Sequence, residues 1–270
     1  MNWKIKDREL TIGRMPLVMG ILNVTPDSFS DGGKFDSYDK AMKQAEKLIS
    51  EGASIIDVGG ESTRPGATEV SADEEIARVV PVIEGIVKNF DVAISVDTYK
   101  AETSEASLRS GAHIINDVYG FLREPEIAPI VASYKAGAVV MSNATMRQDP
   151  NEDIMTFTDN YLKRSLDLCK EAGISDEYIL VDPGVGFGTT REEDTRLIRE
   201  FSYGDNTLLG VSRKRIIAHL LDRETTAGER ASGSVGIALF GAMKGAKVLR
   251  VHDVRETYDA LLTFTAMLEG

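Results

Sequence analysis

The sequence predicts an α/β fold, a (β/α)8 TIM barrel preceded by an N-terminal β-hairpin, and three observations lead to this class. The chain has 270 residues, a length that suits one large α/β barrel. Eight short apolar runs alternate with longer stretches in which apolar residues recur at helical spacing. No low-complexity tract or Pro/Gly/Ser-rich linker divides the chain, so we expect a single domain over residues 1–270.

The expected elements begin with the hairpin, because Trp3 to Ile12 alternates apolar and polar residues around a polar middle. Trp3 is expected to pack this hairpin against the bottom of the barrel. The eight apolar runs that we predict as barrel strands are Leu17–Leu22, Ile55–Val58, Ala93–Val96, Ile114–Ile115, Ala138–Met141, Ile179–Val181, Leu208–Val211 and Val248–Val251.

Helix signals follow the strands. After the first strand, Ser37 is the predicted N-cap, and Gly52 follows the end of the helix. After the second, Ser71 to Glu74 has the pattern of a capping box, and Pro81 is expected to kink or split the helix. An open doubly wound sheet would need a Gly-rich dinucleotide turn after an early strand, and residues 24–27 do not form one, which favours the barrel.

Composition and charge exclude several classes of protein. There are 31 Lys and Arg against 43 Asp and Glu, and the net charge of −12 argues against non-specific binding to nucleic acids or anionic membranes. No apolar run approaches the ~20 residues that span a bilayer, and the N-terminus has no apolar signal core. The single cysteine, Cys169, suits a reducing compartment. We therefore expect a cytoplasmic protein that binds neither nucleic acid nor membrane.

Polar side chains stand at the C-terminal ends of seven of the eight predicted strands, which is where barrels carry their active sites. Any one of them could cap a helix or bracket a loop. Seven converging on one mouth indicate a functional site, because buried carboxylates cost free energy unless they are partnered. These strand-end residues are Asn23, Asp57, Asp97, Asn116, Asp117, Asp182, Ser212, Arg213, Lys214, Arg250, His252 and Asp253.

The residue types indicate what the site binds. Four carboxylate or amide side chains form an array of hydrogen-bond acceptors that suits a flat heterocycle with several N–H donors, and Lys214 can approach a ring carbonyl or nitrogen. The four are Asp57, Asp97, Asn116 and Asp182. Three cationic or N–H-donating residues in an acidic chain imply a bound anion such as phosphate or pyrophosphate. The three are Arg64, Arg250 and His252.

Two loops and the absence of two motifs also bear on function. Residues 23–33 and 59–66 are Gly-containing loops without strand or helix periodicity, and we expect them to close over the mouth of the barrel. No P-loop and no HExxH motif is present, which disfavours a nucleoside triphosphatase and a zinc protease.

These residues resemble the dihydropteroate synthase family over nearly the whole chain. The segments that carry the resemblance are Gly20–Gly33, Asp57–Gly66, Ser95–Thr98, Ile115–Val118, Asp182–Gly188, Ser212–Lys214 and Arg250–Val254, of which the first two and the last are highly specific. The resemblance implies a transferase of folate biosynthesis that joins 6-hydroxymethyl-7,8-dihydropterin pyrophosphate to 4-aminobenzoate. It also implies Mg²⁺ as cofactor, a homodimer and a sulfonamide target.

The resemblance further implies a role for each site residue. Phe29, Thr63, Arg64 and Pro65 would build the aminobenzoate site, and Asn23, Arg250 and His252 would hold the pyrophosphate, with Asn23 also meeting Mg²⁺. The pterin pocket would consist of Asp57, Asp97, Asn116, Met141, Asp182, Phe187 and Lys214. The catalytic residues would be Asp27, Asp31, Arg64, Lys214, Arg250 and His252.

The implied mechanism is consistent with these residue types. Pyrophosphate leaves poorly unless its charge is neutralised, which Mg²⁺, Arg250 and His252 would do. Its loss would leave a carbocation conjugated with the pterin ring, stabilised by carboxylates such as Asp31, and the neutral arylamine would then attack. This resembles the dissociative route of the family.

The sequence departs from the family pattern at three places. Ser142 stands where the family usually has His, Thr189 replaces a Lys, and Arg215 stands where many members have a Ser that contacts the aminobenzoate carboxylate. The second substrate is therefore less well defined than the pterin, and a synthase that uses a substituted aminobenzoate is one alternative.

Two further alternatives are a barrel that presents methyl-tetrahydrofolate to a cobalamin protein and a non-enzymatic pterin-binding barrel. The first needs neither Asn23, Asp31, Arg250 nor His252, and the second would be favoured if Asn23 or a loop cation were missing. All of these residues are present, which favours the synthase.

Overall fold

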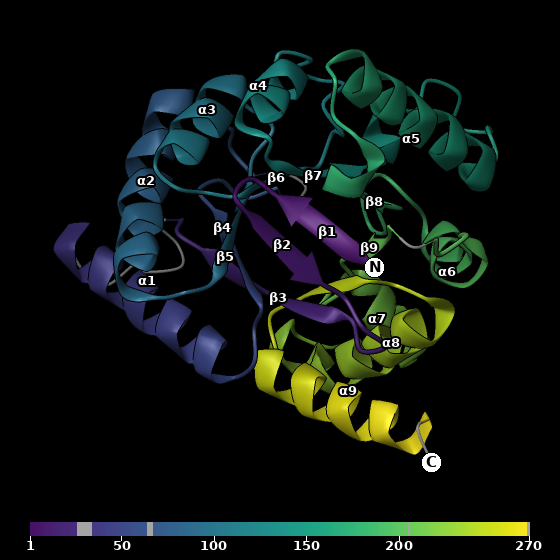
Figure 1. The fold of residues 1–270 in the computed structure, drawn as a ribbon. Helices are drawn as coiled ribbons and strands as arrows, with labels where there is room; N and C mark the ends of the chain where they lie inside the picture. Colours follow the sequence, from purple (N-terminus) through teal and green to yellow (C-terminus); the bar gives the residue numbers. More distant parts are fainter. Residues whose placement is uncertain (26–33, 64–66, 205, 269–270) are drawn as a thin grey trace.

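The computed structural model describes residues 1–25, 34–63, 67–204 and 206–268, and within them eight parallel strands form a barrel with helices on its outside (Figure 1). Neighbouring strands pair in the order β8-β7-β6-β5-β4-β3-β10-β9. Between β8 and β9 a single bridge, Val181 to Thr207, closes the barrel, and we call this junction the seam. The strands are β3 (Leu17–Asn23), β4 (Ile55–Gly59), β5 (Ala93–Asp97), β6 (Ile114–Asp117), β7 (Gly137–Met141), β8 (Ile179–Asp182), β9 (Leu208–Leu209) and β10 (Val248–Val251).

The predicted N-terminal hairpin is confirmed. Strands β1 (Asn2–Ile5) and β2 (Arg8–Thr11) pair antiparallel and lie across one end of the barrel in Figure 1. Trp3 is fully buried there, and its Nε1 donates to the Tyr178 carbonyl oxygen at 2.9 Å. The hairpin thus covers the bottom of the barrel.

The barrel interior begins with a ring of apolar side chains, one from each strand, packed against the hairpin. Successive residues of a strand point to opposite faces, so the residues on either side of this ring face outward into the core between strands and helices. The ring consists of Met19, Ile55, Ala93, Ile114, Val139, Leu180, Leu208 and Val248. Any inward-facing residue beyond this ring lies nearer the opposite, C-terminal mouth of the barrel.

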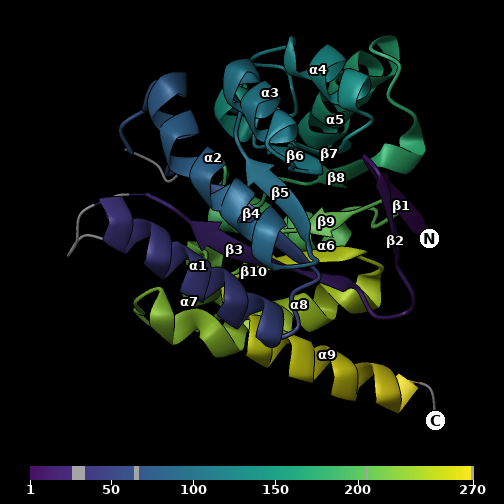
Figure 2. The same cartoon turned by 60° about the vertical axis from the view of Figure 1, so that its left-hand side comes forward.

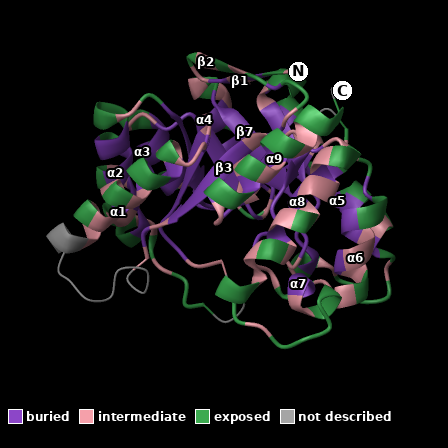
Figure 3. Cartoon of the chain, turned by 90° about the horizontal axis from the view of Figure 1, so that it is seen from below, coloured by how far each residue is buried: buried purple, intermediate pink, exposed green. Residues whose placement is uncertain are grey.

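Helices cover the outer face of the strands, with their apolar sides turned inward (Figures 2 and 3). No helix of the described ranges is long and apolar enough to cross a membrane. The helices are α1 (Lys34–Ser50), α2 (Ala72–Asn89), α3 (Ala101–Arg109), α4 (Ile127–Tyr134), α5 (Ile154–Glu171), α6 (Arg191–Glu200), α7 (Arg215–Leu220), α8 (Ala231–Lys244) and α9 (Val254–Leu268).

Three predicted helix signals differ from the structure. Ser37 is not an N-cap, because α1 begins at Lys34; serine costs little inside a helix, so its capping preference does not fix the start. The Ser71 side chain caps α2 by accepting from the Glu74 amide, but the Glu74 carboxylate pairs with Arg78. Pro81 does not split α2, since it lies on the exposed face, where water can satisfy the carbonyl that its ring leaves unbonded.

Candidate active site

The predicted site residues occupy the second layer of inward-facing positions. Asp57, Asn116, Asp182 and Arg250 each stand two residues beyond a member of the apolar ring, so the period of the strand turns all four into the barrel. Asp97 stands one layer higher, at the end of β5. These five strand-end side chains therefore lie at the C-terminal mouth of the barrel.

Arg250 spans two of the carboxylates. Its Nε donates to Asp57 Oδ2 at 2.6 Å, and its Nη2 donates to Asp97 Oδ2 at 2.5 Å. Burial lowers the pKa of Arg250, but the two carboxylates outweigh it and hold that pKa above the ordinary value. Asn116 Nδ2 lies 3.3 Å from Asp57 Oδ2, so the fully buried Asp57 is held from two sides.

Asp97 keeps one acceptor available. Its Oδ1 is buried and has no hydrogen-bond partner among the described residues. Burial raises the pKa of Asp97 to about 7, which Arg250 opposes and Asp57 reinforces. Buried acceptors are normally satisfied, so this oxygen is suited to an N–H donor of a ligand.

On the opposite side of the mouth, Asp182 and Lys214 are held by the loop between β8 and α6. Asp182 Oδ1 accepts from the Gly184 amide at 2.8 Å, and burial raises the pKa of Asp182. Lys214 Nζ donates to the Val185 carbonyl at 2.6 Å and lies 4.6 Å from the centre of the Phe187 ring. Burial lowers the pKa of Lys214 to about 8, against the opposing effect of Asp182.

This loop needs glycine at Gly184. Its φ of +78° lies in the left-handed region, and a Cβ there would come within 1.8 Å of the Ser142 carbonyl oxygen. The close approach brings the β7 and β8 ends together, and with them Met141, which packs in one cluster with Tyr99 and Val118 beside Phe187. Met141 and Phe187 thus contribute to one apolar cluster beside Lys214.

The remaining polar residues flank this centre. His252 Nδ1 lies 3.1 Å from Ser212 Oγ, and Arg213 next to Ser212 forms a two-point ion pair with Asp253. Asn23, at the end of β3, lies beside Gly59: a Cβ built on Gly59 would be 3.5 Å from Asn23 Oδ1 and 3.7 Å from the Cβ of Asp97.

Asp117 has a structural role. Its two carboxylate oxygens accept from the amides of Tyr119 and Phe121, both at 2.7 Å. Burial raises the pKa of Asp117 to about 7, and the two amides oppose that shift. Asp117 therefore holds the loop that follows β6, as any single Asp at a strand end can do. It does not join Asp57, Asp97 and Asp182 at the mouth of the barrel.

Part of the predicted site lies outside the described residues. Asp27, Phe29, Asp31, Arg64 and Pro65 fall in residues 26–33 and 64–66. Thr63 is described and is half-buried. The residues predicted to bind the pterin and the pyrophosphate are therefore described by the structure, and of those predicted to bind aminobenzoate only Thr63 is.

The structure also contains a buried ion cluster that the sequence patterns did not reveal. Lys100 Nζ donates to Glu61 Oε2 at 2.5 Å and to Glu75 Oε2 at 2.9 Å, and all three side chains are buried. Tyr99 Oη donates to Glu61 Oε1 at 2.7 Å. The cluster connects the start of the 59–66 loop to the end of β5. Its only signal in the sequence was Glu61, which directly follows two glycines.

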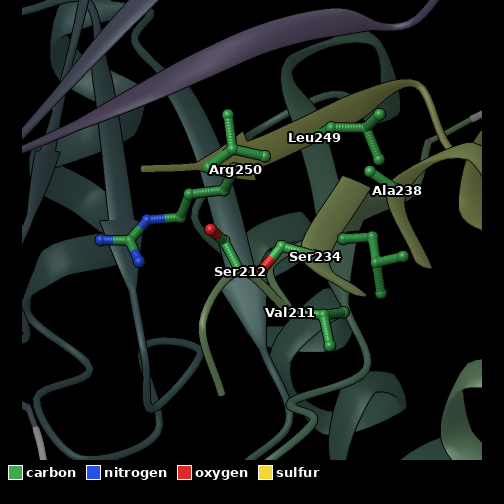
Figure 4. A pocket seen from close by; sticks show the side chains of 8 residues that line it. Val211, Ser212, Ser234, Ala238, Leu249 and Arg250 are labelled. Atoms are coloured by element: carbon green, nitrogen blue, oxygen red, sulfur yellow. The ribbon is translucent and has the colours of Figure 1, made fainter. Parts of the chain in front are cut away.

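Figure 4 shows a small cavity between β9, β10 and α8. Val211, Ala238 and Leu249 line it with apolar groups, while the Arg250 side chain runs away from them. None of its lining residues is a carboxylate, and the guanidinium of Arg250 belongs to the barrel mouth. The cavity therefore lies beside the site, with which it shares Ser212 and part of Arg250.

Comparison with known proteins agrees with this geometry. A family model described as "Pterin binding enzyme" matches residues 19–252. The dihydropteroate synthase of Clostridium beijerinckii is 45% identical over 260 residues, which cover 94% of each chain. The chain belongs to the dihydropteroate synthase family.

Solved structures of this family share the barrel. A Xanthomonas albilineans dihydropteroate synthase with 4-aminobenzoic acid has a TM-score of 0.93 and 39% identity, over 100% of this chain and 98% of that one. The enzyme of the same organism in complex with 7,8-dihydropteroate has a TM-score of 0.90 and 37% identity, over the full length of both chains.

Proposed function

We propose that this site performs the reaction for which its family is named. It joins 6-hydroxymethyl-7,8-dihydropterin pyrophosphate to 4-aminobenzoate and releases 7,8-dihydropteroate and pyrophosphate. The observation that carries the proposal is the convergence of Asp97, Asp182, Lys214 and Arg250 at one mouth, with Asp97 Oδ1 left for a ligand. Family membership argues against the methyl-tetrahydrofolate barrel and against a purely binding role.

The pterin ring binds on the rigid strand ends. Asp97 and Asp182 accept from N–H donors of the ring, and Asn116 adds an amide next to Asp57. Lys214, when protonated, donates to a ring carbonyl or nitrogen. Met141 and Phe187 pack on the apolar faces of the ring, which excludes water and strengthens these hydrogen bonds.

The pyrophosphate lies toward Arg250, His252 and Asn23. Arg250 is held by Asp57 and Asp97, so binding an anion requires its guanidinium to share donors with the incoming phosphate oxygens. As the C–O bond to pyrophosphate breaks, negative charge gathers on the leaving group and positive charge on the methylene carbon. Arg250 and His252 stabilise the first, and Asp31 stabilises the second.

The second substrate completes the reaction. The 4-aminobenzoate nitrogen attacks the methylene carbon, a C–N bond forms, and the nitrogen releases a proton. The site of 4-aminobenzoate consists of Phe29, Thr63, Arg64 and Pro65. Asp27 and Asp31 belong to the loop of residues 23–33. We also propose that sulfonamides inhibit this protein by binding at the aminobenzoate site.

The function is tested by product analysis. Purified protein is given the pterin pyrophosphate alone, then with 4-aminobenzoate or with ring-substituted aminobenzoates, and pyrophosphate release and product mass are measured. We expect 7,8-dihydropteroate only when 4-aminobenzoate is present. Faster turnover of a substituted aminobenzoate would instead support the variant synthase, and turnover of neither would contradict the assignment.

We propose Mg²⁺ as a cofactor that arrives with the pyrophosphate. Among the described residues no group of three or more His, Cys, Asp or Glu side chains is placed to hold a metal ion. The amide oxygen of Asn23 beside Asp97 fits an ion that takes its other ligands from phosphate oxygens and water. When bound, Mg²⁺ neutralises charge on the leaving group.

Removal of Mg²⁺ by EDTA is expected to stop turnover but to leave binding of 6-hydroxymethylpterin unchanged, because that probe carries no pyrophosphate. Asn23→Ala should raise the Mg²⁺ concentration for half-maximal activity by about tenfold. Steady-state kinetics and calorimetric titration measure the two effects. An EDTA-sensitive affinity for the pyrophosphate-free probe would place the metal elsewhere.

We further propose a homodimer formed through α8 and α9. Helix α8 carries no charged residue before Lys244, and yet only Ser234, Ala238 and Gly241 are buried. Met243 of α8 and Leu262 of α9 are 63% and 46% exposed. The two helices lie side by side (Figure 2). An exposed apolar helix face of this kind suits a second copy of the chain.

Light scattering should therefore give a mass near twice 29.5 kDa, and Met243→Lys with Leu262→Lys should lower it to that of one chain. Val87→Lys is the matched control, since Val87 is a similarly exposed apolar residue on α2. A monomeric wild type, or a dimer that survives the double substitution, would exclude this interface. We also propose a cytoplasmic location, which suits the free, buried thiol of Cys169.

A further inference from the structure

Asp194 is a fully buried carboxylate that the reaction described above does not use. It lies in the first turns of α6, and its side chain is 0% exposed. Its Oδ1 accepts from the Gly186 amide at 2.7 Å and from Thr189 Oγ1 at 2.5 Å. Its Oδ2 accepts from Arg191 Nη1 at 2.7 Å, which compensates its charge. Two of these three bonds therefore go to residues of the loop between β8 and α6.

The loop that Asp194 holds is the one that supplies the pterin pocket with its Lys214 and Phe187 contacts. Gly186, whose amide Asp194 accepts, stands between Val185, the acceptor of Lys214 Nζ, and Phe187, whose ring lies against Nζ. A Cβ on Gly186 would lie 3.2 Å from Lys214 Cδ, so the loop backbone also packs along the lysine stem.

Near its two ends the loop is held by the Gly184 amide, which donates to Asp182, and by the Phe187 carbonyl, which accepts from the Ala144 amide, so its middle depends on other contacts. Gly184, Gly186 and Gly188 all have positive φ, and alternating glycines of this kind give a backbone many alternative conformations. At the middle of the loop, the Gly186 amide is bonded by Asp194 and, at 3.1 Å, by Thr189 Oγ1, which itself donates to Asp194. Asp194 is therefore the common anchor of both contacts.

Electrostatics also link Asp194 to Lys214. Four ionised groups face Lys214 from the elements around it: Asp182 on β8, Arg250 on β10, Asp194 on α6 and Asp97 on β5. Burial and Arg250 lower the pKa of Lys214, whereas the three carboxylates raise it. Asp194 thus also favours the protonated, donating form of Lys214.

We propose that Asp194 is a positioning residue for pterin recognition: it fixes the Gly184–Gly188 loop so that Lys214 and Phe187 are presented to the ring. This inference rests on the proposed function of the site. It predicts that Asp194 acts on the pterin and leaves the aminobenzoate site unaffected, because its hydrogen bonds within the described part of the chain go to Gly186, Thr189 and Arg191.

The test compares Asp194→Ala and Asp194→Asn with Glu193→Gln. Glu193 is the next residue of the same helix and is also bonded, to Arg147 and to the Thr190 amide, but it does not contact Gly186. Asp194→Ala should weaken binding of 6-hydroxymethylpterin by about tenfold to a hundredfold and raise KM for the pterin substrate, with little change in KM for 4-aminobenzoate. Asp194→Asn keeps an oxygen for the Gly186 amide and should recover most of the affinity. Glu193→Gln should bind like the wild type.

A second readout does not depend on ligand. Hydrogen exchange of the ligand-free protein should show that amides 184–188 lose protection in Asp194→Ala and keep it in Glu193→Gln. Asp194→Asn carries the test if the alanine variant does not fold: loss of the Asp194 charge should then shift the alkaline limb of pterin binding to lower pH, because Lys214 loses a neighbouring carboxylate.

Wild-type pterin affinity in Asp194→Ala, or an equal loss in Glu193→Gln, would overturn the positioning role alone. An unshifted alkaline limb in Asp194→Asn would overturn its electrostatic part. Failure of the wild-type protein to bind 6-hydroxymethylpterin would instead overturn the proposed function and this inference with it, so the two failures are distinguishable.

Discussion

Asp182→Ala and Asp97→Ala are expected to abolish high-affinity binding of the pterin while the barrel still folds. Each substitution removes the partner of a ring N–H donor, and a buried unpaired donor costs about 1–3 kcal/mol, or more where the partner is charged. At 1.4 kcal/mol for each factor of ten, that cost corresponds to about tenfold to more than a hundredfold in affinity. Calorimetric titration with 6-hydroxymethylpterin measures the effect.

Asp117→Ala is the control for this experiment. Asp117 is also a buried strand-end carboxylate, but its oxygens accept from the backbone amides of Tyr119 and Phe121. Its removal should lower the free energy of unfolding, and the folded protein should bind the pterin much as the wild type does. Wild-type affinity in a folded Asp182→Ala protein would contradict the pocket assignment.

The same residues predict how pterin affinity depends on pH. The pKa of Asp97 is raised to about 7, mainly by burial, so the carboxylate gains a proton and stops accepting from the ring as pH falls through that value. The pKa of Lys214 is lowered to about 8, again mainly by burial, so its donor charge is lost as pH rises through that value. Affinity should therefore be highest between about pH 7 and 8, and Asp97→Asn should remove the acid limb.

Arg250→Met is expected to impair both catalysis and folding. It leaves Asp57 and Asp97 without their shared cation, and breaking a buried ion pair by removing one partner costs about 3–5 kcal/mol of the free energy of unfolding. It also removes a donor to the leaving pyrophosphate, and loss of one such transition-state contact costs about a hundredfold to a thousandfold in kcat. Denaturant unfolding and steady-state kinetics measure the two losses.

Arg213→Met provides the comparison for Arg250. Arg213 forms a two-point ion pair with Asp253 at the same mouth, but its side chain is 34% exposed and touches neither Asp57 nor Asp97. We expect a much smaller loss of stability and near-normal kcat. Arg250→Lys should not restore activity, since a single ammonium lacks the planar fork that joins two carboxylates. Full activity in Arg250→Lys would count against the bridging role.

The site could be predicted from the sequence wherever local pattern decides which way a side chain points. Asp57, Asn116 and Asp182 stand at the ends of apolar runs, and the two-residue period of a strand turns them into the barrel together with the ring below. Lys214 and Arg250 follow or lie on such runs as well. The eight strands, the hairpin and the burial of Trp3 were predictable for the same reason.

Contacts between distant segments were not predictable in this way. The pairing of Arg250 with Asp57 and Asp97 joins residues 193 and 153 positions apart, and no spacing rule says which carboxylates one cation will meet. The Lys100 cluster with Glu61 and Glu75 and the anchoring of Gly186 by Asp194 depend on the packing of α2, α3 and α6 against loops. The prediction that Ser37 caps α1 was wrong for a different reason, because capping preferences are too weak to fix a helix boundary.

The seam between β8 and β9 couples ligand occupancy to the integrity of the barrel. Among the described residues one bridge joins the two strands, while the Asp182 carboxylate reaches across to accept from the Gly210 amide on the far side. Local unfolding of a barrel begins where the fewest bonds must break, so this junction is the natural place for its opening. A pterin held by Asp182, as we propose, would bind only the closed form and, by mass action, would stabilise it by about 2.7 kcal/mol at a hundred times its Kd. We therefore expect bound substrate to protect the folded protein against opening at this junction.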